Sequence, residues 1–307
     1  MIYTITFNPS LDYVVFVDQL NIGSIHRSDN YELIAGGKGI NVSYVLKQLG
    51  CDSTALGFVA GHTGDCFEQL VNEYGITADF IKLKQGMTRI NTKIRSQDSD
   101  KASYLETDIN ANGPVIEKND IDVLLAKLDV LTKEDIVIVS GSVPKSIAPQ
   151  IFYMVLKKCT QMGAIVVVDT SDMYLEAALE SRPWLIKPNK EEIESFFKVK
   201  IDNREQIIDY GRKLQEKGAK NVLISLAGEG AILICEDGNI LMEKAPKGNV
   251  INTVGAGDSM VAGFMVGYIR TESYITALKL GVCAGSATAF STGLASKQEI
   301  EKLLGEI

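Results

Sequence analysis

The sequence is poor in the residues that form disulfide frameworks and metal centres. Its five cysteines are scattered without a Cys-x-x-Cys pair, and it has only two histidines. An odd and dispersed set of cysteines argues against a disulfide framework, and the shortage of paired cysteines and histidines argues against structural zinc. We therefore expect most of the cysteines to be free, buried thiols.

Long apolar runs and an excess of positive charge are also missing. No run approaches the roughly 20 apolar residues that span a bilayer, and the segment Met1 to Phe7 is strand-like without a basic leader. The formal net charge of −8 disfavours general nucleic-acid binding, which depends on a basic surface. We expect a cytoplasmic protein without membrane or nucleic-acid partners, in which local positive groups hold any anionic ligand.

The 307 residues are 46% hydrophobic and 23% charged, as in an ordinary globular protein. Short, β-rich apolar runs alternate with helical patterns along most of the chain. This alternation predicts an α/β fold with a mainly parallel sheet between helices. The predicted core strands are Ile2 to Phe7, Thr54 to Val59, Ile136 to Val139, Ile165 to Asp169, Trp184 to Lys187, Val222 to Leu226 and Ile232 to Cys235.

Four further strand patterns come in pairs without helices between the paired strands. They are Asp12 to Asp18 with Asn30 to Ala35, and Arg89 to Ser96 with Ala102 to Ile109 after a polar turn at 97–101. We predict that residues 11–35 and 87–110 form a small β lid, grown out of a core of residues 1–10, 36–86 and 111–307. Polar and apolar residues alternate from Asn91 to Arg95, so one face of the lid is expected to meet solvent or a ligand.

The run from Thr253 to Ser259 reads TVGAGDS and precedes an apolar segment. Gly255 and Gly257 allow a tight backbone turn, and a helix that starts at Asp258 would direct unpaired N–H groups and its positive dipole end at a phosphate. An ionised Asp258 could accept a proton from a hydroxyl that attacks this phosphate. The alternative is that the aspartate merely caps the helix.

A second glycine cluster, GGKGIN from Gly36 to Asn41, matches neither the Walker A loop nor the dinucleotide fingerprint. It could cradle a ligand or be a structural turn. Asp12 follows the first core strand, at the edge where ligands of open α/β sheets bind, and its carboxylate could accept hydrogen bonds from sugar hydroxyls. The alternative is an ordinary turn, which Asn-Pro and Asp also favour.

Charged and amide side chains elsewhere complete the candidates. Arg27 and Arg89 could clamp a phosphate through their forked donors, or be surface charge. Asn189 and Glu192 are three residues apart and could hold magnesium-bound water on one helical face, or cap the helix. The stretch from Gly228 to Gly230 follows a predicted strand and could lie against an adenine nucleotide, although a lone Gly-x-Gly is a weak signal.

In chain order, the motifs NPSLD, GGKGIN, TRIN, SGS, KPNKEE, SLAGEGA and TVGAGDS run from residue 8 to residue 259. With them the chain resembles the ribokinase-like, or PfkB, carbohydrate kinases over essentially its whole length. The resemblance implies a three-layer ribokinase-like core with a β-sheet lid, usually paired with a second lid in a homodimer. It also implies phosphorylation of a sugar phosphate that requires ATP and Mg²⁺, in many members with a monovalent cation such as K⁺.

The branch of that family that the chain resembles most acts on ketose phosphates. This implies transfer to O6 of fructose 1-phosphate, with tagatose 6-phosphate as the alternative substrate. By position, the resemblance assigns the catalytic base to Asp258 and the anion hole to Gly255, Ala256 and Gly257. It assigns substrate binding to Asp12, Arg27, Gly37, Lys38, Asn41 and Arg89, nucleotide binding to Lys187, Asn189, Ser225, Gly228, Gly230 and Ser286, and water-mediated Mg²⁺ binding to Asn189 and Glu192.

Two other functions deserve comparison. A kinase for a neutral sugar or nucleoside would leave Arg27 and Arg89 without an anionic partner in the substrate. A sensor that has kept the fold and lost the chemistry is expected to lack the base, the anion-hole glycines or the magnesium-linked pair. All of these residues are present, although a fold by itself does not prove activity.

Overall fold

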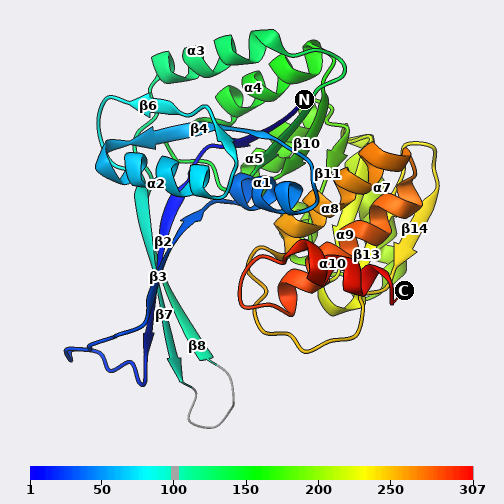
Figure 1. The fold of residues 1–307 in the computed structure, drawn as a ribbon. Helices are drawn as coiled ribbons and strands as arrows, with labels where there is room; N and C mark the ends of the chain where they lie inside the picture. Colours follow the sequence, from blue (N-terminus) through cyan, green and yellow to red (C-terminus); the bar gives the residue numbers. More distant parts are fainter. Residues whose placement is uncertain (98–103, 307) are drawn as a thin grey trace.

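The computed structural model describes residues 1–97 and 104–306. Within them the chain forms a ten-stranded core sheet and a four-stranded sheet that projects from it (Figure 1). The predicted turn beyond Gln97 and residues 102–103 of the predicted strand lie outside the described residues. The larger sheet contains the strands predicted for the core, and the smaller sheet contains the strands predicted for the lid.

The core sheet has the order β14-β13-β12-β11-β10-β9-β1-β4-β5, with β6 also paired to β4. The strands from β12 to β5, with β6, run parallel, and β13 and β14 turn back antiparallel. Their bounds are β1 Ile2–Thr6, β4 Thr54–Ala60, β5 Thr77–Ala78, β6 Ile81–Leu83, β9 Ile136–Ser140, β10 Ile165–Asp169, β11 Leu185–Ile186, β12 Asn221–Ser225, β13 Ala231–Ile234 and β14 Ile240–Glu243. Every predicted core strand is confirmed, and the mainly parallel α/β fold with it. Strands β5, β6 and β14 were not predicted, because two to four residues carry too little periodicity.

Helices cover both faces of this sheet and make a three-layer fold (Figure 1). One apolar cluster joins the sheet to α3 Lys118–Lys127, α4 Pro149–Gln161, α5 Asp172–Glu180, α6 Lys190–Phe197 and α7 Arg204–Glu216. The opposite cluster joins it to α1 Lys38–Gln48, α8 Ala256–Thr271, α9 Tyr274–Ala289 and α10 Lys297–Leu304. A third cluster lies under α2 Gly61–Glu73. Strands buried on both faces explain why the core runs are continuously apolar rather than alternating.

The projecting sheet has the order β3-β2-β7-β8. Its strands are β2 Ser10–Val17, β3 Tyr31–Gly36, β7 Arg89–Gln97 and β8 Tyr104–Asn110. Tyr13 of β2 pairs with Leu33 of β3 and with Thr92 of β7, and Thr92 in turn pairs with Ile109 of β8. Asp12 of β2 pairs with Asn91 of β7. Because side chains alternate between faces, the lid has one largely apolar face and one polar face that carries Asp12.

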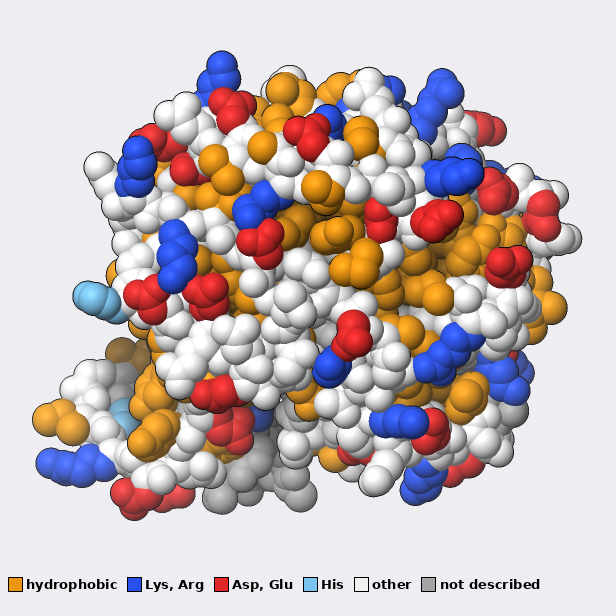
Figure 2. Space-filling model, turned by 45° about the horizontal axis from the view of Figure 1, so that its top comes forward, with side chains coloured by type: hydrophobic (Ala, Val, Ile, Leu, Met, Phe, Trp, Pro, Cys, Tyr) orange, Lys and Arg blue, Asp and Glu red, His pale blue; other side chains and the backbone are white. Residues whose placement is uncertain are grey.

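The five cysteines are free, and three of them are buried: Cys159, Cys235 and Cys283. No helix in the described part of the chain is long and apolar enough to cross a membrane. Figure 2 shows acidic and basic side chains mixed over one face of the molecule. The free state of the five cysteines and the burial of three of them confirm the prediction that most of the cysteines are free, buried thiols.

Candidate active site

The TVGAGDS segment begins helix α8, but two residues earlier than predicted. The helix starts at Ala256, and Gly255 is its N-cap in the left-handed conformation, with φ of 81°. Residues other than glycine are strained at this φ, and a Cβ atom on Gly255 would also lie 2.5 Å from Cδ2 of Leu294, so the turn favours glycine. Asp258 is consequently the third residue of the helix. The expected helix start at Asp258 is wrong, and so is the alternative that Asp258 is the cap.

Asp258 lies buried among charged groups, with 4% of its surface exposed. Its Oδ2 accepts a hydrogen bond of 2.8 Å from Nδ2 of Asn41. Burial, with the negative charge of Asp169, raises the pKa of Asp258 to about 7, against the opposing effect of Lys38 and Lys187. A carboxyl group with a pKa near neutrality is suited to take up and release a proton at physiological pH.

Asp169 ends strand β10 and is 1% exposed. Its carboxylate lies 3.3 Å from Nζ of Lys187 and 3.5 Å from Nζ of Lys38. Burial alone would raise the pKa of Asp169, but the two ammonium groups outweigh it and lower the pKa. Sequence reasoning missed this residue, although a carboxylate at the carboxyl end of a predicted parallel strand was a usable signal.

Lys187 brings positive charge to the start of α8. It is 5% exposed, and its Nζ would lie 3.2 Å from a Cβ atom on Gly257. The amides at the helix N-terminus and this ammonium group therefore share one small region. Such a region favours a phosphate or another anion.

The GGKGIN segment joins this charged region to the lid. Gly37 caps α1 with φ of 120°, and α1 carries Lys38 and Asn41 toward Asp169 and Asp258. A Cβ atom on Gly36 would lie 2.7 Å from Cγ of Asp12. The GGKGIN segment therefore lies against Asp12 of the lid and is hydrogen-bonded to Asp258 of α8. A purely structural turn would require neither contact.

Asp12 and Arg89 lie close together where the lid meets the core. Asp12 Oδ1 accepts hydrogen bonds from Ser10 Oγ at 2.7 Å and from Asn91 Nδ2 at 3.0 Å. Arg89 donates to the backbone carbonyl of Asn8 at 3.1 Å. Burial lowers the pKa of Arg89, and the Asp12 carboxylate opposes this shift. Neither Ser10 nor Asn91 was predicted as a site residue.

Arg27 is the one predicted site residue that this chain places far from the others. It is exposed in the segment between β2 and β3, which juts out to one side of the lid near the end remote from the core (Figure 1). Within the described residues no hydrogen bond or ion pair of Arg27 reaches Asp12 or Arg89. Its role in substrate binding stays a prediction.

A cavity of about 1040 Å³ opens beside the start of α8. Its apolar wall includes Val250, Met260, Val282 and Phe290. A cavity of this size with an apolar wall and a few polar groups is typical of a small-ligand site. Of the predicted anion-hole and nucleotide residues, it is lined by Asn189, Ser225, Gly228, Gly230, Ala256, Gly257 and Ser286.

Asn189 and Glu192 form a reciprocal cap at the start of α6. Asn189 Oδ1 accepts from the Glu192 amide at 2.7 Å, and Glu192 Oε2 accepts from the Asn189 amide at 2.8 Å. The capping alternative is therefore what the geometry shows. The charge of Glu192 also reaches the site, because it adds to the effects of Asp169 and Asp258 that raise the pKa of Lys38.

Among the described residues no group of three or more histidine, cysteine or acidic side chains could enclose a metal ion. Mg²⁺ in phosphoryl-transfer sites usually keeps several waters and takes one or two carboxylates besides the phosphates. Asn189 lines the cavity and the charge of Glu192 acts on Lys38, so this pair fits that looser mode of binding. They do not form an all-protein cage.

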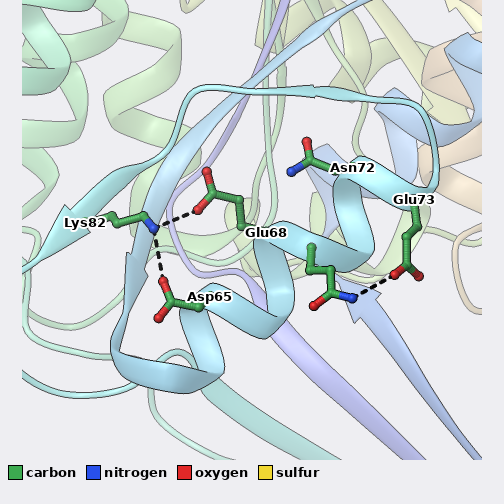
Figure 3. A pocket seen from close by; sticks show the side chains of 6 residues that line it. Asp65, Glu68, Asn72, Glu73 and Lys82 are labelled. Atoms are coloured by element: carbon green, nitrogen blue, oxygen red, sulfur yellow. Dashed lines mark hydrogen bonds and ion pairs between the residues drawn. The ribbon is translucent and has the colours of Figure 1, made fainter.

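A second hollow, of about 520 Å³, lies on the exposed side of α2 (Figure 3). In it Lys82 reaches between Asp65 and Glu68, at 3.0 Å from each carboxylate. These charges neutralise one another at an open surface. The hollow contains none of the predicted site residues.

Comparison with known proteins gives a consistent picture. The model of the pfkB family of carbohydrate kinases matches residues 6–301. A 1-phosphofructokinase of Bacillus subtilis is 40% identical over 307 residues, which cover all of this chain and 98% of that protein. A D-tagatose-1-phosphate kinase of Bacillus licheniformis is 34% identical, over all of this chain and 98% of its own. The crystal structure of Escherichia coli phosphofructokinase-2 in complex with potassium has a TM-score of 0.92 at 26% identity, covering 99% of this chain and 98% of that one.

Proposed function

The chain belongs to the pfkB family of carbohydrate kinases, and from this we propose that it transfers the γ-phosphoryl group of ATP to O6 of fructose 1-phosphate. The products are fructose 1,6-bisphosphate and ADP. The name of the B. subtilis relative supports this choice of acceptor. The observation that carries the chemistry is the buried carboxylate of Asp258, within the first turn of the helix that lines the large cavity.

Asp258 acts as the base in this proposal. It accepts the proton of the C6 hydroxyl while O6 forms a bond to the γ-phosphorus and the bond from that phosphorus to the bridging oxygen breaks. ADP leaves with the electron pair of the broken bond. A pKa of about 7 lets the carboxylate take the proton and release it to solvent after turnover.

The backbone amides of Gly255 to Asp258 and the ammonium of Lys187 stabilise the negative charge on the phosphoryl group during its transfer. Fixed dipoles and charges in a buried site stabilise such charge more than water does. Mg²⁺, held through water by Asn189 and Glu192, would supply further positive charge on the phosphates. A monovalent cation such as K⁺ belongs to the proposal because the E. coli phosphofructokinase-2 structure contains potassium.

The nucleotide is proposed to lie in the large cavity, with its phosphates toward α8. The cavity walls include Ser225, Gly228, Gly230 and Ser286. Lys187 is buried next to Gly257, which lines the cavity, and is proposed to contact the phosphates there.

The sugar phosphate is proposed to lie between the polar face of the lid and the GGKGIN segment. Asp12, Gly37 and Asn41 are the proposed contacts of the sugar, with Lys38 and Arg89 toward its charged end. Arg27 is proposed to contact the same phosphate after two subunits assemble through their lids or after the lid moves. The polar face that carries Asp12 supports this placement.

A homodimer through the lid is also proposed. Tyr13, Tyr31, Leu33 and Ile109 are large apolar side chains left exposed on one lid face. A contiguous apolar surface of this kind is usually covered by a partner, and a second copy of the chain carries the same surface. A cytoplasmic location completes the proposal, because ATP is the phosphoryl donor.

The experiment is a coupled assay of ADP formation with MgATP and one acceptor at a time. Fructose 1-phosphate should give the highest kcat/KM. Fructose, fructose 6-phosphate and tagatose 6-phosphate are the comparison acceptors, and the name of the B. licheniformis relative adds tagatose 1-phosphate. A higher kcat/KM with tagatose 6-phosphate would favour the alternative substrate. Higher activity with fructose itself would remove the sugar-phosphate assignment.

A further inference from the structure

Two buried polar side chains of the lid sheet converge on one oxygen of Asp12. The donors are Ser10 Oγ, at 2.7 Å from Asp12 Oδ1, and Asn91 Nδ2, at 3.0 Å from the same atom. Ser10 is 1% exposed and Asn91 is 6% exposed. A carboxylate oxygen that accepts two buried hydrogen bonds is held in one orientation, because rotation of the side chain would break both of them.

The backbone fixes this arrangement. Asp12 and Asn91 are directly paired in the parallel register of β2 and β7, and Ser10 lies two residues before Asp12 on the same face. Gly36 confines the carboxyl group from another side, since a Cβ atom there would lie 2.7 Å from Asp12 Cγ. In the described part of the chain the hydrogen bonds of the Asp12 side chain go to Oδ1, which leaves Oδ2 for a ligand.

Asn91 also carries an unsatisfied acceptor. Its Oδ1 is buried and has no hydrogen-bond partner among the described residues. The amide orientation is set by Asp12, because a carboxylate oxygen must face the N–H₂ group rather than the amide oxygen. A buried acceptor without a partner is costly, and such atoms are expected where a ligand or an ordered water completes the hydrogen bonds.

We propose that Ser10 and Asn91 position Asp12 for the sugar substrate, so that Asp12 Oδ2 and Asn91 Oδ1 together accept hydrogen bonds from ketose hydroxyl groups. This inference rests on the proposed function, since the hydroxyl groups belong to the sugar phosphate. It assigns a specificity role to two residues outside the glycine clusters. The phosphate end of the substrate and the nucleotide are not involved.

A double-mutant cycle tests the positioning role. Ser10→Ala should lower kcat/KM for fructose 1-phosphate about fivefold, mainly through KM, and leave KM for ATP within about twofold. In an Asp12→Ala background the same substitution should change kcat/KM by less than about twofold, because there is no carboxylate left to position. Ser195→Ala is the matched control, since Ser195 is exposed on α6, outside the lid, and should behave as the unaltered protein.

Asn91→Asp gives a second, independent measurement. It keeps the shape of the side chain but replaces the N–H₂ donor by an oxygen that repels Asp12. We expect a loss in kcat/KM for the sugar phosphate of about 50-fold or more, with KM for ATP within about twofold. Equal losses for Ser10→Ala with and without Asp12, or a parallel rise in KM for ATP in Asn91→Asp, would overturn the inference. If the unaltered protein forms no ADP with any ketose phosphate, the proposed function fails instead, and the two failures are therefore distinct.

Discussion

Asp258 and Asn41 stand 217 positions apart in the chain and are joined by a hydrogen bond of 2.8 Å between carboxylate and carboxamide. The bond connects the first turn of α8 to α1, the helix that follows lid strand β3. The GGKGIN segment beside the lid and the TVGAGDS segment beside the cavity therefore meet at the carboxylate of Asp258. Substitution of Asp258 should therefore lower the rate of phosphoryl transfer more than it weakens the binding of either ligand.

Replacement of this carboxylate gives the first prediction. Asp258→Asn keeps the size of the side chain and removes the base, so kcat should fall by about 10²- to 10⁴-fold. Binding of MgATP, measured by isothermal titration calorimetry, should stay within about threefold, because the cavity is lined by other residues. Asp122→Asn, the same change at an exposed position of α3, is the control and should leave both quantities unaltered. Turnover by Asp258→Asn at the unaltered rate would remove the base assignment.

The pH dependence of the reaction follows from the pKa of Asp258, which is raised to about 7. Only the ionised carboxylate can accept the hydroxyl proton, so kcat/KM for the sugar phosphate should rise with pH through about 7 and fall roughly tenfold per unit below it. The phosphate of the substrate loses its second proton near pH 6, so that inflection belongs to the substrate. The residual rate of Asp258→Asn should lack the inflection near 7. A flat profile between pH 6.5 and 8, values chosen as about half a unit below and one unit above the pKa, would contradict this prediction.

The same pKa also predicts how stability depends on pH. The pKa of Asp258 is raised from 3.8 to about 7 on folding, so the folded state holds this proton more tightly. Stability is therefore lost as pH rises from about 4 to about 7, and Asp258→Asn should avoid that loss. At pH 8, the free energy of unfolding in urea should be higher for the variant, by up to about 4 kcal/mol. At about pH 4 the two proteins should be similar, and equal stability at both pH values would disprove the linkage.

The buried charge group around Asp169 gives a prediction about folding. Asp169→Asn leaves the ammonium of Lys187 buried without its carboxylate, which should cost about 3–5 kcal/mol of unfolding free energy. Adding Lys187→Met should recover part of that loss, because the uncompensated charge is gone. Urea unfolding monitored by circular dichroism measures both effects.

An exposed ion pair provides the matched control for Asp169. Asp65 lies 3.0 Å from Lys82 at the surface (Figure 3). Asp65→Asn should change the free energy of unfolding little, because solvent screens exposed pairs. An Asp169→Asn variant no less stable than Asp65→Asn would show that the buried carboxylate does not compensate the lysines.

Much of the fold could be predicted from the sequence because the core strands are continuously apolar and separated by helical patterns. The lid strands were visible for the opposite reason, since they lack helices between them. Short edge strands such as β5 Thr77–Ala78 gave no pattern, and they form only because β4 offers an unpaired edge. The start of α8 was misplaced because the sequence does not reveal the left-handed φ of Gly255.

The candidate site was predictable where a motif carries the chemistry, as at Asp258 and the glycines before it. Contacts between distant segments were not. Asp169 appeared as the last residue of a strand, and only the packing of two lysines on it reveals its place in the site. Asn91 appeared as one polar residue in an alternating strand, and its hydrogen bond to Asp12 depends on the register of β2 and β7.

The central claim is that phosphate is transferred from ATP to O6 of fructose 1-phosphate at Asp258. Phosphorus NMR of a reaction that contains fructose 1-phosphate, MgATP and the protein tests it most directly. We predict two phosphomonoester signals, at C1 and C6 of one ketose, growing in step with ADP, and growth at least about a hundredfold slower with Asp258→Asn. Formation of ADP and free phosphate without a new phosphomonoester, or equal product from Asp258→Asn, would contradict the account.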